Sequence, residues 1–378
     1  MKKLCLLVFL LASAPVFAAA QATVTPPAPD IAARAYVLVD YLSGQTLRQQ
    51  AGDERMEPAS LTKLMTAYLT FAALHQGVIK LDQTLPVSER AWQAEGSRMF
   101  IDPKTPVTVD ELIRGMIVQS GNDASIALAE GISGNEEEFV RRMNQEAQRL
   151  GMKNTHFMNV TGLPHLQHYT TAHDLSLLAR AIIRDFPEFY PIYSQKEYKY
   201  NKITQANRNR LLWQDPTVDG MKTGHTESAG FCLIASAKRE SRRLISVVLG
   251  TSSESMRASE SQKLLNYGFL NFDTHHLYQR GQVVATLPVW EGSVNSLKAG
   301  VSQDLFVSLP KGQYARLKAT LVSKQPLLAP ISAGQQIGVI HLTLNDKPYA
   351  EYPLVALEGV SAANLFKRGW DGIKLWFK

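Results

Sequence analysis

The chain has 378 residues, of which 45% are hydrophobic, enough for at least one large core and more naturally divided between two domains. Lysines and arginines outnumber acidic residues by 40 to 34, and the basic excess is spread out except at the two chain ends. These properties indicate an ordinary globular protein and argue against a nucleic-acid-binding one.

The first residues have the pattern of an export signal. Lys2 and Lys3 form a basic start, an apolar run follows from Leu4 to Leu11, and small residues surround Ala18. A transmembrane anchor would need about 20 apolar residues without such a cleavage pattern. We therefore expect residues 1–20 to be a signal peptide and the mature chain to act outside the cytoplasm.

The elements that follow predict an α/β (α+β) domain. Residues 21–30 are mostly small and Pro-rich and predict a linker. The turn Ser43-Gly44 between two apolar runs predicts a β-hairpin, and Ser60 to Leu74 predicts a mostly buried helix. Further helices are expected over 109–150 and 175–184, and antiparallel strands over 218–223, 231–237 and 244–249.

The C-terminal third changes character. Short β-rich runs separated by turn residues predict a small all-β domain over residues 273–360, of the sandwich type. Residues 361–378 form an amphipathic helix when placed on a helical wheel, with aromatic residues on one side and basic residues elsewhere. This pattern is typical of a helix lying on a membrane surface, although a helix packed on the protein itself would also accommodate it.

Ser60-Leu61-Thr62-Lys63 is the first candidate for chemistry. Residues three apart on a helix share a face, so the Ser60 hydroxyl and the Lys63 amine can be neighbours. The amides of a helix N-terminus would stabilise negative charge on a reacting oxygen. The string is common by chance, and an N-cap is the more frequent role of a serine at this position.

Ser120-Gly121-Asn122 lies between two helical stretches and predicts a short, buried loop at the wall of a site. The string recurs at Ser133-Gly134-Asn135, but there it precedes three glutamates and a long polar helix, which is typical of a capped helix start. We therefore select Ser120 and Asn122.

Lys222-Thr223-Gly224 ends a strand-like run and is followed by His225. This string is rarer than the other two. The order of the three motifs behind an export signal is what makes a chance combination improbable.

On these motifs the chain resembles the penicillin-binding protein and serine β-lactamase superfamily, and most closely the exported D-alanyl-D-alanine carboxypeptidases of the penicillin-binding protein 5 and 6 type. Asn207 to Trp213, Arg257 to Ser261 and the terminal helix add to the resemblance, which covers nearly the whole mature chain. It implies a transpeptidase-like domain over residues 31–272, with a central antiparallel sheet flanked by helices, followed by a β-rich domain and a membrane-surface anchor.

The resemblance also implies the role of each residue. Ser60 would be the acylated nucleophile, Lys63 its base, and Ser120 the group that relays a proton to the leaving amine. Lysine has an ordinary pKa of about 10.4, so burial and the nearby charge of Lys222 would have to lower that of Lys63. The oxyanion would lie between the backbone amides of Ser60 and His225. The substrate-binding residues would be Asn122, Lys222, Thr223, Gly224, His225, Arg257 and Arg208.

The implied partners are a peptidoglycan stem peptide ending in D-Ala-D-Ala, β-lactam antibiotics, and a membrane surface contacted through residues 361–378. The implied location is the periplasm, at the outer face of the inner membrane. No cofactor or metal is implied, because the nine histidines include no His-Glu-x-x-His string. A DD-endopeptidase, a β-lactamase and a catalytically weak penicillin-binding module remain as alternatives; no convincing Glu-x-x-x-Asn loop follows Ser120, which disfavours the β-lactamase.

Overall fold

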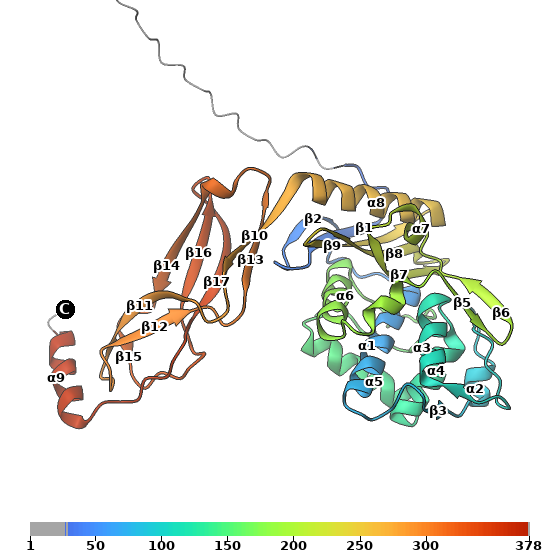
Figure 1. Ribbon diagram of the computed structural model, residues 1–378, viewed down its shortest axis with the longest axis horizontal. Coiled ribbons are helices and arrows are strands. Elements are labelled where there is room, and N and C mark those ends of the chain that lie inside the picture. The colour runs from blue at the N-terminus through green and yellow to red at the C-terminus, as the bar shows by residue number, and fades with distance from the viewer. Residues whose placement is uncertain (1–26, 28, 377–378) are drawn as a thin grey trace, which may run out of the picture.

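The computed structural model describes residue 27 and residues 29–376 (Figure 1). The predicted signal peptide and most of the predicted linker lie outside the described residues. From Ala35 onward the chain forms a larger α/β domain and then a smaller β-rich domain that ends in a helix.

A five-stranded antiparallel sheet organises the larger domain, in the order β2-β1-β9-β8-β7. Alternate residues of each strand face opposite sides, so Val37 and Val39 enter one core while Tyr36 and Leu38 enter another. Both faces are therefore covered. The strands are β1 (Ala35–Asp40), β2 (Thr46–Gln50), β7 (Val218–Thr226), β8 (Gly230–Arg239) and β9 (Arg242–Thr251).

Helices cover the two faces of this sheet unequally (Figure 1). The long helix α8 (Glu254–Asn271) packs on one face, and most of the other helices lie on the opposite face. The helices are α1 (Lys63–His75), α2 (Glu89–Trp92), α3 (Val109–Val118), α4 (Asn122–Ser133), α5 (Glu136–Arg149), α6 (Ala172–Asp185) and α7 (Leu211–Gln214). Smaller elements are the 3₁₀ turns η1 (Ala59–Thr62) and η2 (Tyr190–Ser194), and the pairs β3 (Thr84–Leu85) with β4 (Val107–Thr108) and β5 (Glu197–Tyr200) with β6 (Ile203–Ala206).

The predicted helix from Ser60 to Leu74 begins later than expected. Residues Ala59–Thr62 form a 3₁₀ turn, and the α-helix starts at Lys63. Ala59 has a φ of 47°, in the left-handed region, so the chain turns sharply before it enters the helix. Ser60 therefore lies on the 3₁₀ turn and not in the first turn of an α-helix.

The smaller domain is all-β. A six-stranded sheet has the order β14-β16-β17-β12-β11-β15, and the pair β10-β13 shares a hydrophobic core with it, as expected for two packed sheets. Three of its strands, β10, β12 and β15, were not predicted. The elements are β10 (Phe272–Tyr278), β11 (Val283–Trp290), β12 (Ser296–Gly300), β13 (Leu305–Pro310), η3 (Tyr314–Arg316), β14 (Leu317–Ser323), β15 (Leu327–Leu328), β16 (Gln336–Leu344) and β17 (Lys347–Ala356).

Hydrogen bonds join the two domains at the turn between β1 and β2. Asp40 accepts one from Thr274, at 2.5 Å, and the Ser43 and Ser308 hydroxyls lie 2.7 Å apart. Gln45 Oε1 accepts another from the backbone of Ser308. Asp40 is 1% exposed, so the bond from Thr274 ties the β-rich domain to a buried carboxylate.

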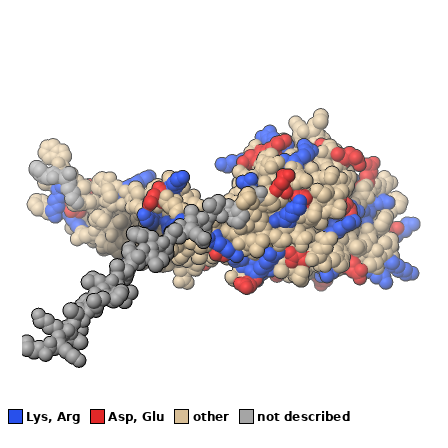
Figure 2. All heavy atoms as spheres, turned by 90° about the horizontal axis from the view of Figure 1, so that it is seen from above, with Lys and Arg blue, Asp and Glu red and all other residues tan. Residues whose placement is uncertain are grey.

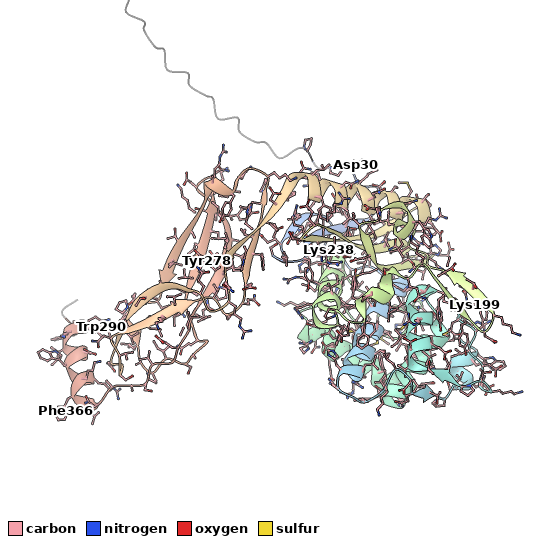
Figure 3. All side chains as sticks on the ribbon, viewed as in Figure 1. Asp30, Lys199, Lys238, Tyr278, Trp290 and Phe366 are labelled. Atoms are coloured by element: carbon pink, nitrogen blue, oxygen red, sulfur yellow. The ribbon has the colours of Figure 1, made fainter. Side chains whose placement is uncertain are left out.

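The C-terminal helix α9 (Leu365–Trp376) rests on the far end of the β-rich domain through its polar side. Asp371 is buried and accepts a hydrogen bond from the backbone of Glu291, and Lys367 donates one to the carbonyl of Gly292. Large apolar side chains on this helix face outward instead, and Figure 3 shows Phe366 at the outer end of the molecule. The exposed side chains are Leu365, Phe366, Trp370, Ile373 and Trp376.

Within the described part of the chain, no helix is both long and apolar enough to cross a membrane. Basic and acidic side chains are intermingled on the face of the larger domain that Figure 2 presents.

Candidate active site

Ser60 and Lys63 are hydrogen bonded. In a 3₁₀ turn, side chains three residues apart eclipse each other, and η1 brings Lys63 Nζ to 3.0 Å from Ser60 Oγ. Lys63 is 1% exposed. Ser60 and Lys63 are therefore neighbours, as predicted. The 3₁₀ turn brings them together, not the α-helix that the sequence predicted.

A loop that sequence reasoning missed holds the other side of Lys63. The carbonyl of Thr161 accepts a hydrogen bond from Lys63 Nζ at 2.6 Å. Asn159 Oδ1 accepts hydrogen bonds from the backbone amides of Thr161 and Gly162 and so fixes this turn. Gly162 has a φ of 87°, and a Cβ there would lie 1.8 Å from the carbonyl oxygen of Ala59. Only glycine fits this close approach.

Ser120 faces the third motif. Lys222 Nζ, on β7, donates hydrogen bonds to Ser120 Oγ at 2.9 Å and to the carbonyl of Thr223 at 3.0 Å. Ser120 is 3% exposed and has a φ of 66°, a strained value for a residue with a side chain. The repeated string behaves as expected too, since Asn135 is the N-cap of α5 and accepts from the backbone of Glu138.

Asn122 is buried at the start of α4 and is fixed by a segment that was also not predicted. Its Nδ2 donates to the carbonyl of Glu95, and its backbone amide donates to the carbonyl of Ser97. Among the residues that the structure describes, its Oδ1 has no hydrogen-bond partner. Buried acceptors without a partner are uncommon in proteins, which makes this oxygen a candidate contact for a bound molecule.

A cavity of about 400 Å³ lies in front of the two serines. Three predicted residues, Lys63, Asn122 and Lys222, do not line it and are buried behind it. Lys222 Nζ reaches the cavity wall through its contact with Ser120. The cavity is lined by Ser60, Gly96, Ser97, Ser120, Arg208, Thr223, Gly224, His225, Phe231, Glu254 and Arg257.

Arg257, on α8, supplies a buried cation at the wall of this cavity. It is 2% exposed and packs over the ring of Phe231, which also stacks on His225 with ring centroids 4.0 Å apart. Glu254, which sequence reasoning missed, lies 3.4 Å from the Arg257 guanidinium. Because Glu254 sits one helical turn before Arg257, a helix prediction over this segment would have revealed it.

The pKa values of both lysines are lowered. That of Lys63 falls to about 7, first because the group is buried and second because of the positive charge of Arg208, while Asp123 opposes the shift. That of Lys222 falls well below its ordinary value, through burial and then the charge of Lys63. Lys63 and Lys222 thus lie close enough for their charges to repel each other, and the positive charge of Arg208 lowers the pKa of both.

Comparisons with known proteins decide the family. The D-alanyl-D-alanine carboxypeptidase family of serine peptidases, S11, matches residues 20–253, and the C-terminal domain of penicillin-binding protein 5 matches residues 272–362. The chain belongs to the D-alanyl-D-alanine carboxypeptidase family. It is a serine-type carboxypeptidase, a hydrolase, with a penicillin-binding protein fold.

Relatives in this family match over most of their length. D-alanyl-D-alanine carboxypeptidase DacC of Escherichia coli K12 is 42% identical and covers 98% of this chain and 94% of its own length. DacA of Haemophilus influenzae is 44% identical over 94% of this chain and 91% of its own. The crystal structure of penicillin-binding protein 5 from Haemophilus influenzae superposes with a TM-score of 0.85, covering 89% of this chain and 99% of that one, at 44% identity.

Proposed function

We propose that this enzyme removes the terminal D-alanine from peptidoglycan stem pentapeptides through an acyl-enzyme formed on Ser60. The observation that carries the proposal is the pair of serine and lysine contacts behind one cavity, Ser60 with Lys63 and Ser120 with Lys222. Each serine thus has an amine within hydrogen-bond distance, which is the arrangement that nucleophilic catalysis and proton relay need.

In the first step, neutral Lys63 accepts the proton of Ser60 as Oγ attacks the carbonyl between the two D-alanines. A pKa of about 7 keeps a useful fraction of Lys63 neutral at physiological pH. The carbonyl of Thr161 holds the amine in place without adding a negative charge that would raise its pKa. The backbone amides of Ser60 and His225 would receive the oxyanion.

In the second step, the carbon–nitrogen bond breaks and the leaving amine takes a proton from Ser120, which is replenished by Lys222. Free D-alanine departs and leaves an ester between Ser60 and the remaining tetrapeptide. The proton that Lys63 took from Ser60 passes to the Ser120 and Lys222 pair, which restores neutral Lys63 and recharges Lys222. Water then attacks the ester, Lys63 takes the water's proton and gives it to the Ser60 oxygen, and Ser60 leaves as a hydroxyl. The net reaction consumes one water and releases one D-alanine.

Recognition of the substrate's free carboxylate falls to residues on the cavity wall. Arg257, Thr223 and Arg208 line the cavity, which supports assigning this role to them. Burial of Arg257 strengthens its attraction for an anion. Asn122 Oδ1, a buried oxygen without a partner among the described residues, would accept a hydrogen bond from the substrate's peptide amide when the substrate reaches it. Gly224 lets β7 approach η1, because a Cβ there would meet Ala59 at 3.2 Å.

A β-lactam presents an amide carbonyl and a carboxylate in one small molecule, so the same groups should bind it and acylate Ser60. The solved structures of penicillin-binding protein D2 from Listeria monocytogenes, bound to ampicillin and to cefotaxime, match 64% of this chain with a TM-score of 0.60. They support β-lactam binding here.

We also propose that α9 attaches the enzyme to a membrane surface, at the outer face of the inner membrane in the periplasm. The outward-facing aromatic residues Phe366, Trp370 and Trp376 support this proposal, because they would be buried by lipid while the helix stays docked through Asp371.

Incubation of the enzyme with defined muropeptides, with products identified by mass, tests the proposal against its alternatives. Loss of one alanine from a pentapeptide is expected. Cleavage of cross-linked dimers in preference to pentapeptides would indicate a DD-endopeptidase, rapid turnover of benzylpenicillin a β-lactamase, and no product at all a catalytically weak binding module.

A further inference from the structure

A second cavity, of about 630 Å³, lies next to the active site. It is lined by Asn201, in the turn between β5 and β6, and by six residues that precede α3: Trp92, Gln93, Arg98, Phe100, Ile101 and Asp102. Ser97 lines the active-site cavity and the following residue, Arg98, lines the second one. The two cavities are therefore adjacent.

The wall of this second cavity is held in a strained conformation. Phe100 has a φ of 68°, which a bulky side chain rarely adopts, and yet it is 44% exposed. The buried carboxylate of Asp123 accepts hydrogen bonds from the backbone amides of Met99, Phe100 and Ile101 and so maintains this backbone. Strain of this kind persists where the surroundings impose it, and it is frequent at ligand sites.

Asp123 directly follows Asn122, and these two neighbouring residues hold the chain segments that line the two cavities. Asn122 contacts the carbonyls of Glu95 and Ser97, while Asp123 holds the segment that begins two residues later. The strained backbone does not bury the Phe100 ring. It holds the ring exposed to solvent instead.

The groups around the cavity combine aromatic faces with hydrogen-bonding side chains. Trp92 is 44% exposed, and the Arg98 guanidinium lies 5.2 Å from the centroid of the Phe100 ring while it donates to the carbonyl of Trp92. Gln93 and Asp102 add amide and carboxylate groups. Exposed aromatic rings beside several polar side chains suit a ligand with both apolar faces and many hydroxyls.

We infer that this second cavity binds the glycan part of the substrate, an N-acetylated amino sugar to which the stem peptide is attached. The C–H face of such a sugar would stack on Trp92 or Phe100, and its hydroxyl and acetamido groups would bond to Arg98, Gln93 and Asp102. The inference rests on the proposed function, because it concerns the remote end of the same substrate.

The lengths agree with this assignment. Four residues of a pentapeptide separate the sugar from the cleaved bond, and extended they span at most about 14 Å. Phe100 lies three positions after Ser97, and this stretch of chain spans at most about 11 Å. An extended stem peptide is thus longer than the stretch of chain that joins a residue of the active-site cavity to a residue of the second cavity.

The test compares two substrates on the full mature chain: a free pentapeptide ending in D-Ala-D-Ala, and the same pentapeptide attached to the disaccharide of N-acetylglucosamine and N-acetylmuramic acid. We expect kcat/KM to be about 3- to 10-fold higher for the glycopeptide, the range that one aromatic stacking contact provides. Of Trp92→Ala and Phe100→Gly, the variant that removes the stacking ring should bring this ratio close to one.

Phe100→Gly relieves the strain at this backbone, and Phe100→Asn, which tolerates the same φ, is a second variant in case the first does not fold. The matched control is Trp213→Ala, since Trp213 is similarly exposed at 49% but lines neither cavity. This control should keep the ratio of the unaltered enzyme.

Equal kcat/KM for the two substrates in the unaltered enzyme would overturn the inference while leaving the proposed function intact. A ratio that survives both Trp92→Ala and the Phe100 variants would overturn it as well, because the sugar would then bind elsewhere. Release of D-alanine from neither substrate would instead contradict the proposed function.

Discussion

Lys222 Nζ lies 2.9 Å from Ser120 Oγ, a contact between residues that are 102 positions apart in the sequence. It complements the contact of Lys63 with Ser60 and divides the work between two amines. In the proposed mechanism Lys63, with a pKa of about 7, accepts the proton of Ser60, while Lys222 supports Ser120 as it protonates the leaving group.

Substitution of Arg208 should move the pH dependence of acylation. Lys63 must be neutral to act as a base, so the acylation rate rises with pH through about 7. Because the charge of Arg208 lowers the pKa of Lys63, Arg208→Gln should raise that pKa and move the midpoint to higher pH. Arg208→Lys keeps the charge and should leave the midpoint nearly in place.

Stopped-flow acylation by a chromogenic β-lactam between pH 5 and pH 9 measures the midpoint of each variant. Equal midpoints for Arg208→Gln and the unaltered enzyme would contradict this account.

Lys63→Met should slow acylation and raise the melting temperature. Loss of the base should slow acylation by about 10²- to 10⁴-fold. The pKa of Lys63 is about 7 in the folded state and about 10.4 when unfolded, so between these values the unfolded state binds more protons and stability rises with pH. The penalty for the buried cation is therefore greatest below pH 7. We expect Lys63→Met to raise the melting temperature more at pH 6 than at pH 9. The opposite order would show that the amine is not destabilised by burial.

Gly162→Ala should distort η1, the 3₁₀ turn that carries Ser60. Its Cβ would overlap the carbonyl of Ala59, beside Ser60, and its φ of 87° is strained for alanine. Gly151→Ala is the matched control, because Gly151 has a φ of 83° and a Cβ there would meet nothing within 4 Å. Both variants should lose about 1 kcal/mol or more of unfolding free energy, but only Gly162→Ala should lose most of its acylation rate. Equal acylation rates would mean that this close approach does not position Ser60.

Removal of α9 should release the enzyme from lipid. Deletion of residues 365–378 takes away the exposed apolar side chains and leaves the active site untouched. Co-sedimentation with anionic vesicles should fall to background while D-alanine release from a soluble pentapeptide is retained. The double variant Phe366→Ser and Trp370→Ser, which keeps the helix contacts of Asp371, should behave in the same way. Undiminished sedimentation of both would place the lipid contact elsewhere.

The sequence was sufficient to predict the family's fold and the residues whose side chains meet at the site. Motif order identified Ser60, Ser120 and Lys222, and local composition separated Ser120 from the repeated string at Ser133. The family comparison agrees with these predictions about fold and activity.

The supporting contacts were not predictable in the same way, because they are made by backbone atoms. The Thr161 carbonyl that holds Lys63 and the Glu95 carbonyl that holds Asn122 belong to loops whose side chains carry no motif. The role of Arg208 also depends on tertiary structure, since a charge acts through distance and burial and not through sequence spacing. Asp123 was overlooked for a different reason: its carboxylate binds backbone amides over 20 residues away.

The most direct test of the central claim is intact-mass spectrometry of the enzyme after a brief exposure to benzylpenicillin, followed by peptide mapping. The account predicts an increase equal to one penicilloyl group, located on Ser60, and no such adduct in Ser60→Ala. An unmodified protein, or an adduct on any other residue, would contradict it.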